Sequence, residues 1–95
     1  MYKIYVIFKS YDNKREAFMK KVRDEGIYDA IHAEDGCIRY DYFFSEKDAN
    51  EILLIEEWES AAHQQAHIQT PHMAKLREFK DDYIESTLIG EFETK

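Results

Sequence analysis

The sequence contains little cysteine, proline or glycine, and no long apolar run. Of its 95 residues, one is cysteine, one is proline and three are glycine. A single cysteine excludes a disulfide within the chain and suits a reducing compartment. No apolar run approaches the roughly 20 residues of a membrane-spanning helix, and the first residues alternate like a strand instead of forming a secretory leader. We therefore expect one domain over residues 1–95, located in the cytoplasm and without a membrane partner.

Basic charge is also scarce. The chain has 20 acidic residues against 13 lysines and arginines, which gives a formal net charge of −7. Binding to nucleic acid or to an anionic membrane depends on basic surface, so we expect neither partner. Aromatic residues make up 15% of the chain, which suits a pocket or an interface lined by rings and favours a small-molecule substrate.

The strongest pattern in the chain covers residues 52–73. The run Ile52–Ile55 is apolar without interruption, which is typical of a strand covered on both faces. After Trp58 the period changes from two residues to 3.6, and Ser60 has the side chain of a helix cap. Thr70–Pro71 has the composition of a second helix start. These elements should bring one tryptophan and three histidines into one neighbourhood: Trp58, His63, His67 and His72.

The rest of the chain supplies three further strands and an interrupted helix. Alternating residues predict strands over 2–9 and 37–44, and a last strand that begins at residue 83 or 84 and ends at 92. Helical spacing predicts a helix before residue 33 that breaks near Gly26, because glycine costs about 1 kcal/mol in a helix. Asn13 and Glu16 have the spacing of a capping box at its start.

The order strand, helix, strand, strand, helix, strand predicts an α+β fold. It builds a four-stranded antiparallel sheet with helices on one face, the ferredoxin-like arrangement. Alternation in the second strand places a set of apolar residues on one face: Ile38, Tyr40, Tyr42 and Phe44. The strands are apolar on both faces, so we expect a second copy to cover the face without helices and form a homodimer. If Trp58 faces the helices, Glu57 faces this partner and can meet Arg39 there.

Two stretches carry a resemblance to a known family. Leu54–Ser60 (LIEEWES) and Ala66–Met73 (AHIQTPHM) look like the antibiotic biosynthesis monooxygenase family, and its quinol monooxygenase branch in particular. Gly36–Tyr40 (GCIRY) resembles the start of that family's second strand. The resemblance implies a dimeric α+β barrel of ferredoxin-like subunits with a pocket between sheet and helices. It also implies oxidation of an electron-rich phenol, quinol or anthrone by O₂ without metal or flavin.

Membership of this family does not fix the reaction, because related members isomerise a phosphorylated signalling sugar or degrade haem. The haem-degrading members resemble each other in an asparagine on the first strand, a tryptophan on the helix and a later histidine. Residues 2–9 contain no asparagine, and His67 and Arg77 stand where the tryptophan and the histidine would be. We therefore do not expect haem degradation.

Cofactor-free oxidation requires a base that works near pH 7 and groups that stabilise the resulting oxyanion. Histidine, with an unshifted pKa of about 6.5, suits the base. We take His67 and His72 as the catalytic candidates, with His67 preferred. Four further residues are candidates for substrate binding as pocket walls, donors or rim: Trp58, Tyr40, Tyr83 and His63. Packing or capping remains an alternative role for each.

The spacing His63-x3-His67-x4-His72 also invites a metal interpretation, since histidines one turn apart on a helix can bind Zn²⁺. However, Pro71 begins a new helix and should turn His72 away from the earlier helix axis. No HExxH motif supports a metal site. We therefore expect no metal and no other cofactor.

Three functions remain open from the sequence. The first is a cofactor-independent monooxygenase of a small quinol or phenol. The second is a non-oxidative isomerase of a small, phosphorylated or unphosphorylated, carbonyl compound in the same pocket. The third is a non-catalytic module that binds a small ligand, for example in a stress response. Oxygen uptake in the presence of quinols would separate the first function from the others.

Overall fold

The computed structural model describes residues 1–92 of the chain as a four-stranded sheet under a layer of helices. Each of the two helical segments between strands consists of two separate helices. The elements follow in the order β1 (Tyr2–Ser10), α1 (Arg15–Asp24), α2 (Ile27–His32), β2 (Cys37–Phe44), β3 (Glu51–Trp58), α3 (Ala61–Ile68), α4 (Pro71–Lys80) and β4 (Ile84–Glu91). This order confirms the predicted succession of strands and helices.

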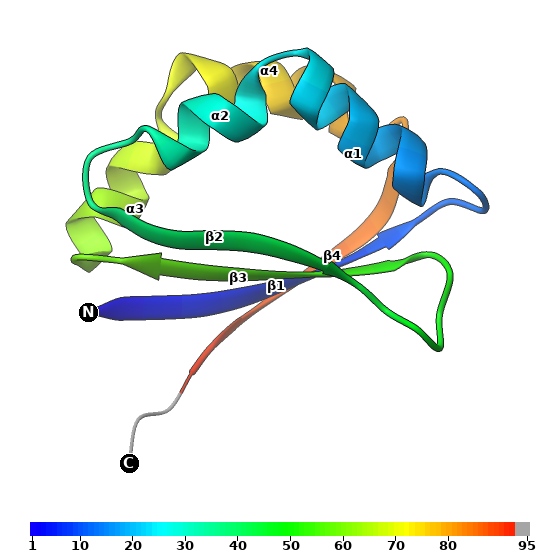
Figure 1. Cartoon of the computed structure of the whole chain (residues 1–95), viewed down its shortest axis with the longest axis horizontal. Coiled ribbons are helices and arrows are strands. Elements are labelled where there is room, and N and C mark those ends of the chain that lie inside the picture. Colours follow the sequence, from blue (N-terminus) through cyan, green and yellow to red (C-terminus); the bar gives the residue numbers. More distant parts are fainter. Residues whose placement is uncertain (93–95) are drawn as a thin grey trace.

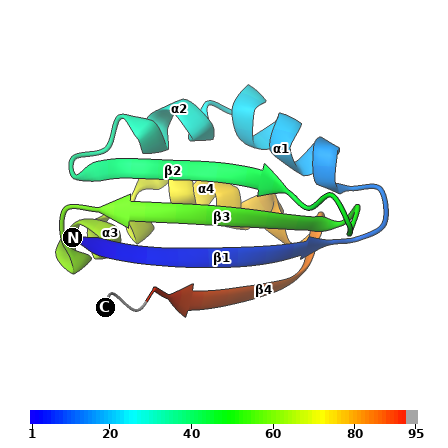
Figure 2. The same ribbon diagram turned by 60° about the horizontal axis from the view of Figure 1, so that its bottom comes forward.

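The four strands form one antiparallel sheet in the order β2-β3-β1-β4 (Figure 2). The two central strands, β1 and β3, are the ones with the strongest apolar patterns, as expected for strands with a neighbour on each side. All four helices lie over the same face of the sheet (Figure 1). The predicted α+β, ferredoxin-like architecture is therefore confirmed.

The helical segment between β1 and β2 breaks at Gly26, as predicted. Gly26 has φ of 74° and separates α1 from α2, a left-handed conformation that glycine adopts without a steric penalty. The predicted capping box is wrong. α1 begins after Lys14 without a side-chain cap, and Asn13 has φ of 63°. A residue in this left-handed conformation belongs to the preceding turn and does not have the extended backbone of an N-cap.

The two caps predicted for the helices between β3 and β4 are confirmed. The backbone N–H of His63 donates to Ser60 Oγ at the start of α3, and that of Met73 donates to Thr70 Oγ1 at the start of α4. Pro71 occupies the first turn of α4, where a missing N–H costs nothing. These caps fix where α3 and α4 begin, and so they set the directions in which the side chains of both helices point.

A bulge at the start of β2 changes the predicted facing set of that strand. The pairing with β3 shifts between Cys37 and Arg39, so that Cys37 packs against the core and Ile38 is 48% exposed. Beyond the bulge the alternation holds, and Tyr40 points into the core. The prediction was thus correct for Tyr40 and wrong for Ile38, because an extra residue reverses the alternation on one side of a bulge.

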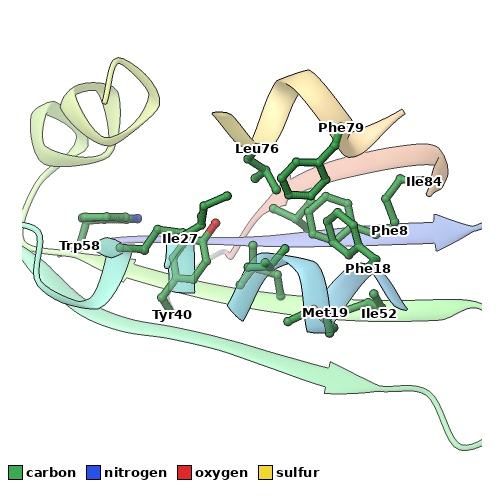
Figure 3. Packing of buried hydrophobic residues seen from close by; sticks show 14 residues of the cluster. Phe8, Phe18, Met19, Ile27, Tyr40, Ile52, Trp58, Leu76, Phe79 and Ile84 are labelled. Carbon is green, nitrogen blue, oxygen red and sulfur yellow. The ribbon is translucent and has the colours of Figure 1, made fainter. Parts of the chain in front are cut away.

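The core under α1 and α2 is filled by apolar side chains. The buried residues of these two helices are Phe18, Met19, Val22, Ile27 and Ile31. The ring of Phe18 lies 6.1 Å from that of Phe8 and 6.3 Å from that of Phe79, between the sheet and α4. Figure 3 shows these rings gathered at one end of the core, with Trp58 at the other end.

The face of the sheet without helices is also apolar. A shallow groove of about 540 Å³ on this face is lined by Lys3, Arg39, Phe43, Leu53, Ile55, Glu57 and Phe92. Arg39 Nη1 lies 3.5 Å from Glu57 Oε2, so the predicted meeting of these two side chains occurs already within one chain. The predicted partner on this face stays a prediction. Among the described residues, no helix is long and apolar enough to cross a membrane.

Candidate active site

A cavity of about 330 Å³ lies between the sheet and the helices α3 and α4. Most of its wall is apolar, contributed by all four strands and by α3 and α4. The lining residues are Ile4, Val6, Phe8, Tyr40, Leu54, Glu56, Gln64, His67, Ile68, Met73, Leu76, Arg77, Lys80, Thr87 and Ile89. A concave apolar site with a few polar groups is the usual form of a small-molecule site.

His67 forms part of the cavity wall. Its side chain is 2% exposed, and its ring lies 4.8 Å from the Trp58 ring and 5.4 Å from the Tyr40 ring. Nδ1 of His67 lies 2.7 Å from Glu34 Oε2. Because an ionised carboxylate only accepts hydrogen bonds, this contact places the proton on Nδ1. Nε2 is then the ring nitrogen with a free lone pair, as a general base requires.

Burial sets the charge state of His67. Removal from water lowers the pKa of the imidazole below its usual value, and this effect outweighs the hydrogen bond to Glu34, which raises the pKa. The ring is therefore neutral at pH 7. A neutral histidine beside a carboxylate can take a proton at Nε2, while the carboxylate stabilises the resulting imidazolium.

His72 reaches the same carboxylate from the next helix. Its Nε2 lies 2.7 Å from Glu34 Oε2, and its side chain is partly exposed. Although Pro71 was expected to turn His72 away from the axis of the earlier helix, His72 and His67 meet at this carboxylate. A new helix does begin at Pro71, but the change of direction brings both imidazoles to Glu34. His72 is not among the residues that line the cavity.

Glu34 is a functional candidate that sequence reasoning missed. It lies in the turn between α2 and β2, where Gly36 has φ of 80°. The only signal in the sequence is the turn composition of residues 34–36 (EDG), and a turn carboxylate is usually a solvated group. The short helix α2 runs from the break at Gly26 to His32 and so delivers Glu34 to the histidines.

Glu56 was also missed as a site residue. It lines the cavity, is 4% exposed and accepts a hydrogen bond from Trp58 Nε1 at 3.0 Å. Burial raises the pKa of this carboxyl to about 7; the hydrogen bond from Trp58 opposes the rise, and the charge of Glu34 adds to it. A signal was present in the sequence, because Glu56 occupies an inward position in the alternation of β3, between Leu54 and Trp58.

Tyr40 and Trp58 both lie near the cavity, where substrate-binding residues were expected, but only Tyr40 is part of its lining. Tyr40 lines the cavity directly, and burial raises the pKa of its phenol well above its usual value, which keeps the O–H as a donor. Trp58 lies behind the lining, against the ring of His67. It supports the wall and binds Glu56 without contacting the cavity.

Tyr83 and His63 lie outside the cavity. Tyr83 follows the end of α4 and packs against Phe18 and Phe79, with ring centroids 6.1 Å away in both cases. His63 Nδ1 lies 2.7 Å from Ser60 Oγ, and its ring covers Gly36 so closely that a Cβ there would come within 2.2 Å of it. Neither residue lines this cavity, and the structure gives both of them packing contacts; their predicted contact with substrate stays a prediction.

Glu34, His67 and His72 also form a group whose ligand atoms all lie within 4.8 Å of one another. Two histidines and a carboxylate can hold Zn²⁺ or Fe²⁺. Both histidine contacts to Glu34 are 2.7 Å long, which is a charge-assisted hydrogen-bond distance. Ligands of a tetrahedral zinc with bonds of about 2.1 Å would stand about 3.4 Å apart. The spacing thus fits a hydrogen-bonded network better than a metal centre.

The match to a family model covers residues 1–78, and the chain belongs to the antibiotic biosynthesis monooxygenase family. Among curated proteins it is similar to the probable quinol monooxygenase YgiN of Escherichia coli K12, with 35% identity over 71 residues, or 65% of this chain and 68% of that protein. This relationship confirms the resemblance to the quinol monooxygenase branch.

Solved structures show the same fold at lower identity. The crystal structure of PA3566 from Pseudomonas aeruginosa has a TM-score of 0.86 and 19% identity, over 99% of this chain and 93% of that one. A crystal structure of an antibiotic biosynthesis monooxygenase has a TM-score of 0.86 and 20% identity, over 100% and 99% of the two chains. At these identities the likeness shows the fold alone.

Proposed function

We propose that this protein is a cofactor-independent monooxygenase that oxidises a small quinol or phenol with O₂. One observation carries the proposal: the buried His67 lies in the wall of an apolar cavity, with Nδ1 held by Glu34 and Nε2 left free. The membership of the family and the similarity to a probable quinol monooxygenase support the same reaction class.

The proposed reaction begins with transfer of the substrate's hydroxyl proton to His67 Nε2. The electron-rich anion then reduces O₂, and the two combine at a ring carbon. One oxygen atom stays on that carbon and the other leaves as water, so that a quinol and O₂ give a hydroxyquinone and water. The substrate supplies all the electrons for this change, and the chemistry therefore requires no flavin or metal. A dry cavity favours it by protecting the reactive intermediates from water.

Two further groups have roles at the oxyanion. The Tyr40 phenol stays protonated, and the Glu56 carboxyl, with a pKa of about 7, is partly protonated at neutral pH. Either can donate a hydrogen bond to the negative charge that develops on the substrate. His72 acts at a distance, because its bond to Glu34 holds the carboxylate that orients His67.

The test is oxygen consumption with purified protein and a panel of hydroquinones and naphthohydroquinones. We expect one O₂ consumed per substrate, with one atom of isotopically labelled O₂ in the product. If no compound of the panel is oxidised faster with the protein than without it, the monooxygenase assignment is wrong.

The isomerase alternative is favoured by the pairing of His67 and Glu34, since the same base can remove a proton beside a carbonyl. Exchange of that proton for deuterium from solvent, without O₂ uptake, would establish it. Binding of a small ligand with neither O₂ uptake nor deuterium exchange would support the third function, a non-catalytic binding module.

A homodimer in a reducing compartment remains part of the proposal. Its support is the apolar groove on the open face of the sheet and the lone, partly buried Cys37, whose pKa is raised by burial to about 11. Leu53 lies in that groove, so Leu53→Asp should produce monomers in analytical ultracentrifugation. A wild-type protein that sediments as a monomer at micromolar concentration contradicts the dimer.

A further inference from the structure

Two cations line the cavity that contains His67. Both belong to α4: Arg77 and Lys80 are three residues apart and so share one side of the helix. Lys80 Nζ lies 5.2 Å from the centroid of the Phe8 ring, which is itself part of the cavity wall. Lys80 is half-buried and Arg77 is exposed, so a chain with a net charge of −7 presents two cations at the wall of an apolar cavity.

Lys80 lies at the opposite end of the cavity from the proposed base, and Arg77, one helical turn earlier on α4, lies closer to that base. Ile4 pairs with Glu56, whose neighbour Trp58 packs on His67, whereas Phe8 lies under Lys80. Phe8 lies four positions after Ile4 along β1, a distance of about 13 Å. The cavity is therefore elongated, with the base at one end, Lys80 at the other and Arg77 between them.

No carboxylate among the cavity-lining residues offsets this charge locally. The one acidic residue of the lining is Glu56, at the other end. No salt bridge of Lys80 or Arg77 occurs within residues 1–92; Arg77 Nη1 donates to the carbonyl of Ile68 at 3.1 Å and keeps further donors free. Burial lowers the pKa of Lys80, and the negative charge of the neighbouring Asp81, which lies outside the cavity lining, opposes this only in part. An anion at this place would offset the cost of burying the ammonium.

We propose that the cavity binds an aromatic hydroxyl compound that carries an anionic group, such as a carboxylate or a phosphate, on a short chain. The hydroxyl lies at His67 and the anion meets Lys80 and Arg77. The placement of the hydroxyl rests on the proposed function, whereas the anion site rests on the cavity alone. The two cations then select among phenols and quinols by charge, and they fix the orientation in which the ring enters.

The experiment measures binding without turnover. 3-(2,5-Dihydroxyphenyl)propanoate and its neutral amide differ in charge and little in shape, and their affinities can be compared by calorimetry in the absence of O₂. Wild-type protein should bind the acid at least about tenfold more tightly than the amide, a size expected for a hydrogen-bonded charge. Lys80→Gln and Arg77→Gln should each lose most of this preference while binding the amide unchanged.

Lys75→Gln is the matched control. Lys75 belongs to the same helix but pairs with Glu25 outside the cavity, at 3.8 Å. The substitution removes the same charge from the molecule and should leave the preference for the acid intact. Loss of the preference in Lys75→Gln to the same extent as in Lys80→Gln would mean that only overall charge matters, and would overturn the proposal.

Equal affinity of the wild-type protein for acid and amide, or no binding of either, would also overturn it. A preference that survives in both cavity variants would have the same consequence. The outcomes for this proposal and for the proposed function can be told apart. Charge-selective binding without O₂ uptake would support the anion site and contradict the monooxygenase. O₂ uptake with the amide as fast as with the acid would support the monooxygenase and contradict the anion site. Replacing the carboxylate by a phosphate monoester on the same chain distinguishes the two kinds of anion.

Discussion

The helices cover the sheet in two different ways. Under α1 and α2 the residues that face the sheet, such as Phe18 and Ile27, are almost completely buried, and the hollow on this side is a surface groove between α1 and the edge strand β2. Under α3 and α4 a cavity remains, with His67 and Glu56 in its wall. None of the residues that line this cavity comes from α1 or α2.

The contrast shows where the fold is stabilised and where it is free to bind. Close packing maximises dispersion contacts, so we expect the part of the core under α1 and α2 to contribute most of the stability. A void and buried polar groups both cost free energy. The same low-polarity surroundings raise the pKa of Glu56 and lower that of His67, because burial favours the uncharged form of each group.

The sharpest test of the cavity under α3 and α4 is His67→Gln, which keeps a polar side chain but removes the base. We expect kcat/KM to fall about 10³-fold, within the range for loss of general-base catalysis. His32→Gln is the control, because His32 is an exposed histidine of α2 that bonds only to the Tyr28 carbonyl within the described chain. Equal rates for the two variants would show that His67 is a packing residue.

Truncation of an aliphatic residue in each half compares the packing directly. Ile27→Ala opens a void among filled neighbours and should lower the free energy of unfolding by about 4 kcal/mol, whereas Leu76→Ala, beside an existing cavity, should cost about 2 kcal/mol. Urea unfolding at one fixed protein concentration measures both, since self-association would also affect stability. A larger loss for Leu76→Ala would reverse the comparison.

Glu56 predicts a dependence of stability on pH. Its folded pKa of about 7 lies above the unfolded value of 4.5. The folded state therefore binds this proton more tightly, and the contribution is fully present below pH 4.5 and is lost as the pH rises to 7. The loss should amount to at most about 3 kcal/mol. Glu56→Gln should flatten the unfolding free energy between these pH values while keeping the Trp58 hydrogen bond. An unchanged slope would show that Glu56 is ionised throughout.

The smallest effect is expected for Glu34→Gln. The amide can still hold His67 in place, but without the charge that raises the imidazole pKa. We expect kcat/KM to fall about 10-fold to 100-fold, as for other residues that orient a catalytic group. The acidic limb of the pH profile should move to lower pH. Asp35→Asn is the control, since Asp35 is the exposed neighbour in the same turn. A purely structural role for Glu34 would leave the pH profile in place.

Much of the fold could be predicted because its signals are local. The alternation of β1 and β3, the caps Ser60 and Thr70, and the break at Gly26 each follow from a few adjacent residues. Two local details were wrong, and both concern backbone geometry that composition does not fix: the left-handed Asn13 and the bulge that exposes Ile38.

The candidate site could be predicted only in part. His67 and Tyr40 carried signals of their own, in a family-like stretch and in an alternating strand. Glu34 did not, because its role depends on two histidines more than 30 residues away along the chain. Tyr83 continued the helical spacing of α4, but the helix ends at Lys80 and the ring turns to Phe18 and Phe79.

The sequence by itself determined the order of strands and helices, the inward faces of the central strands and the family. These follow from periodicity, caps and turn residues, which act over one or two turns of chain. Only the tertiary structure decided that a turn carboxylate joins two histidines, and that Lys80 and Glu56 lie at opposite ends of one cavity. Such arrangements depend on how distant segments pack, and burial, which sets the charge of each group, exists only after they have packed.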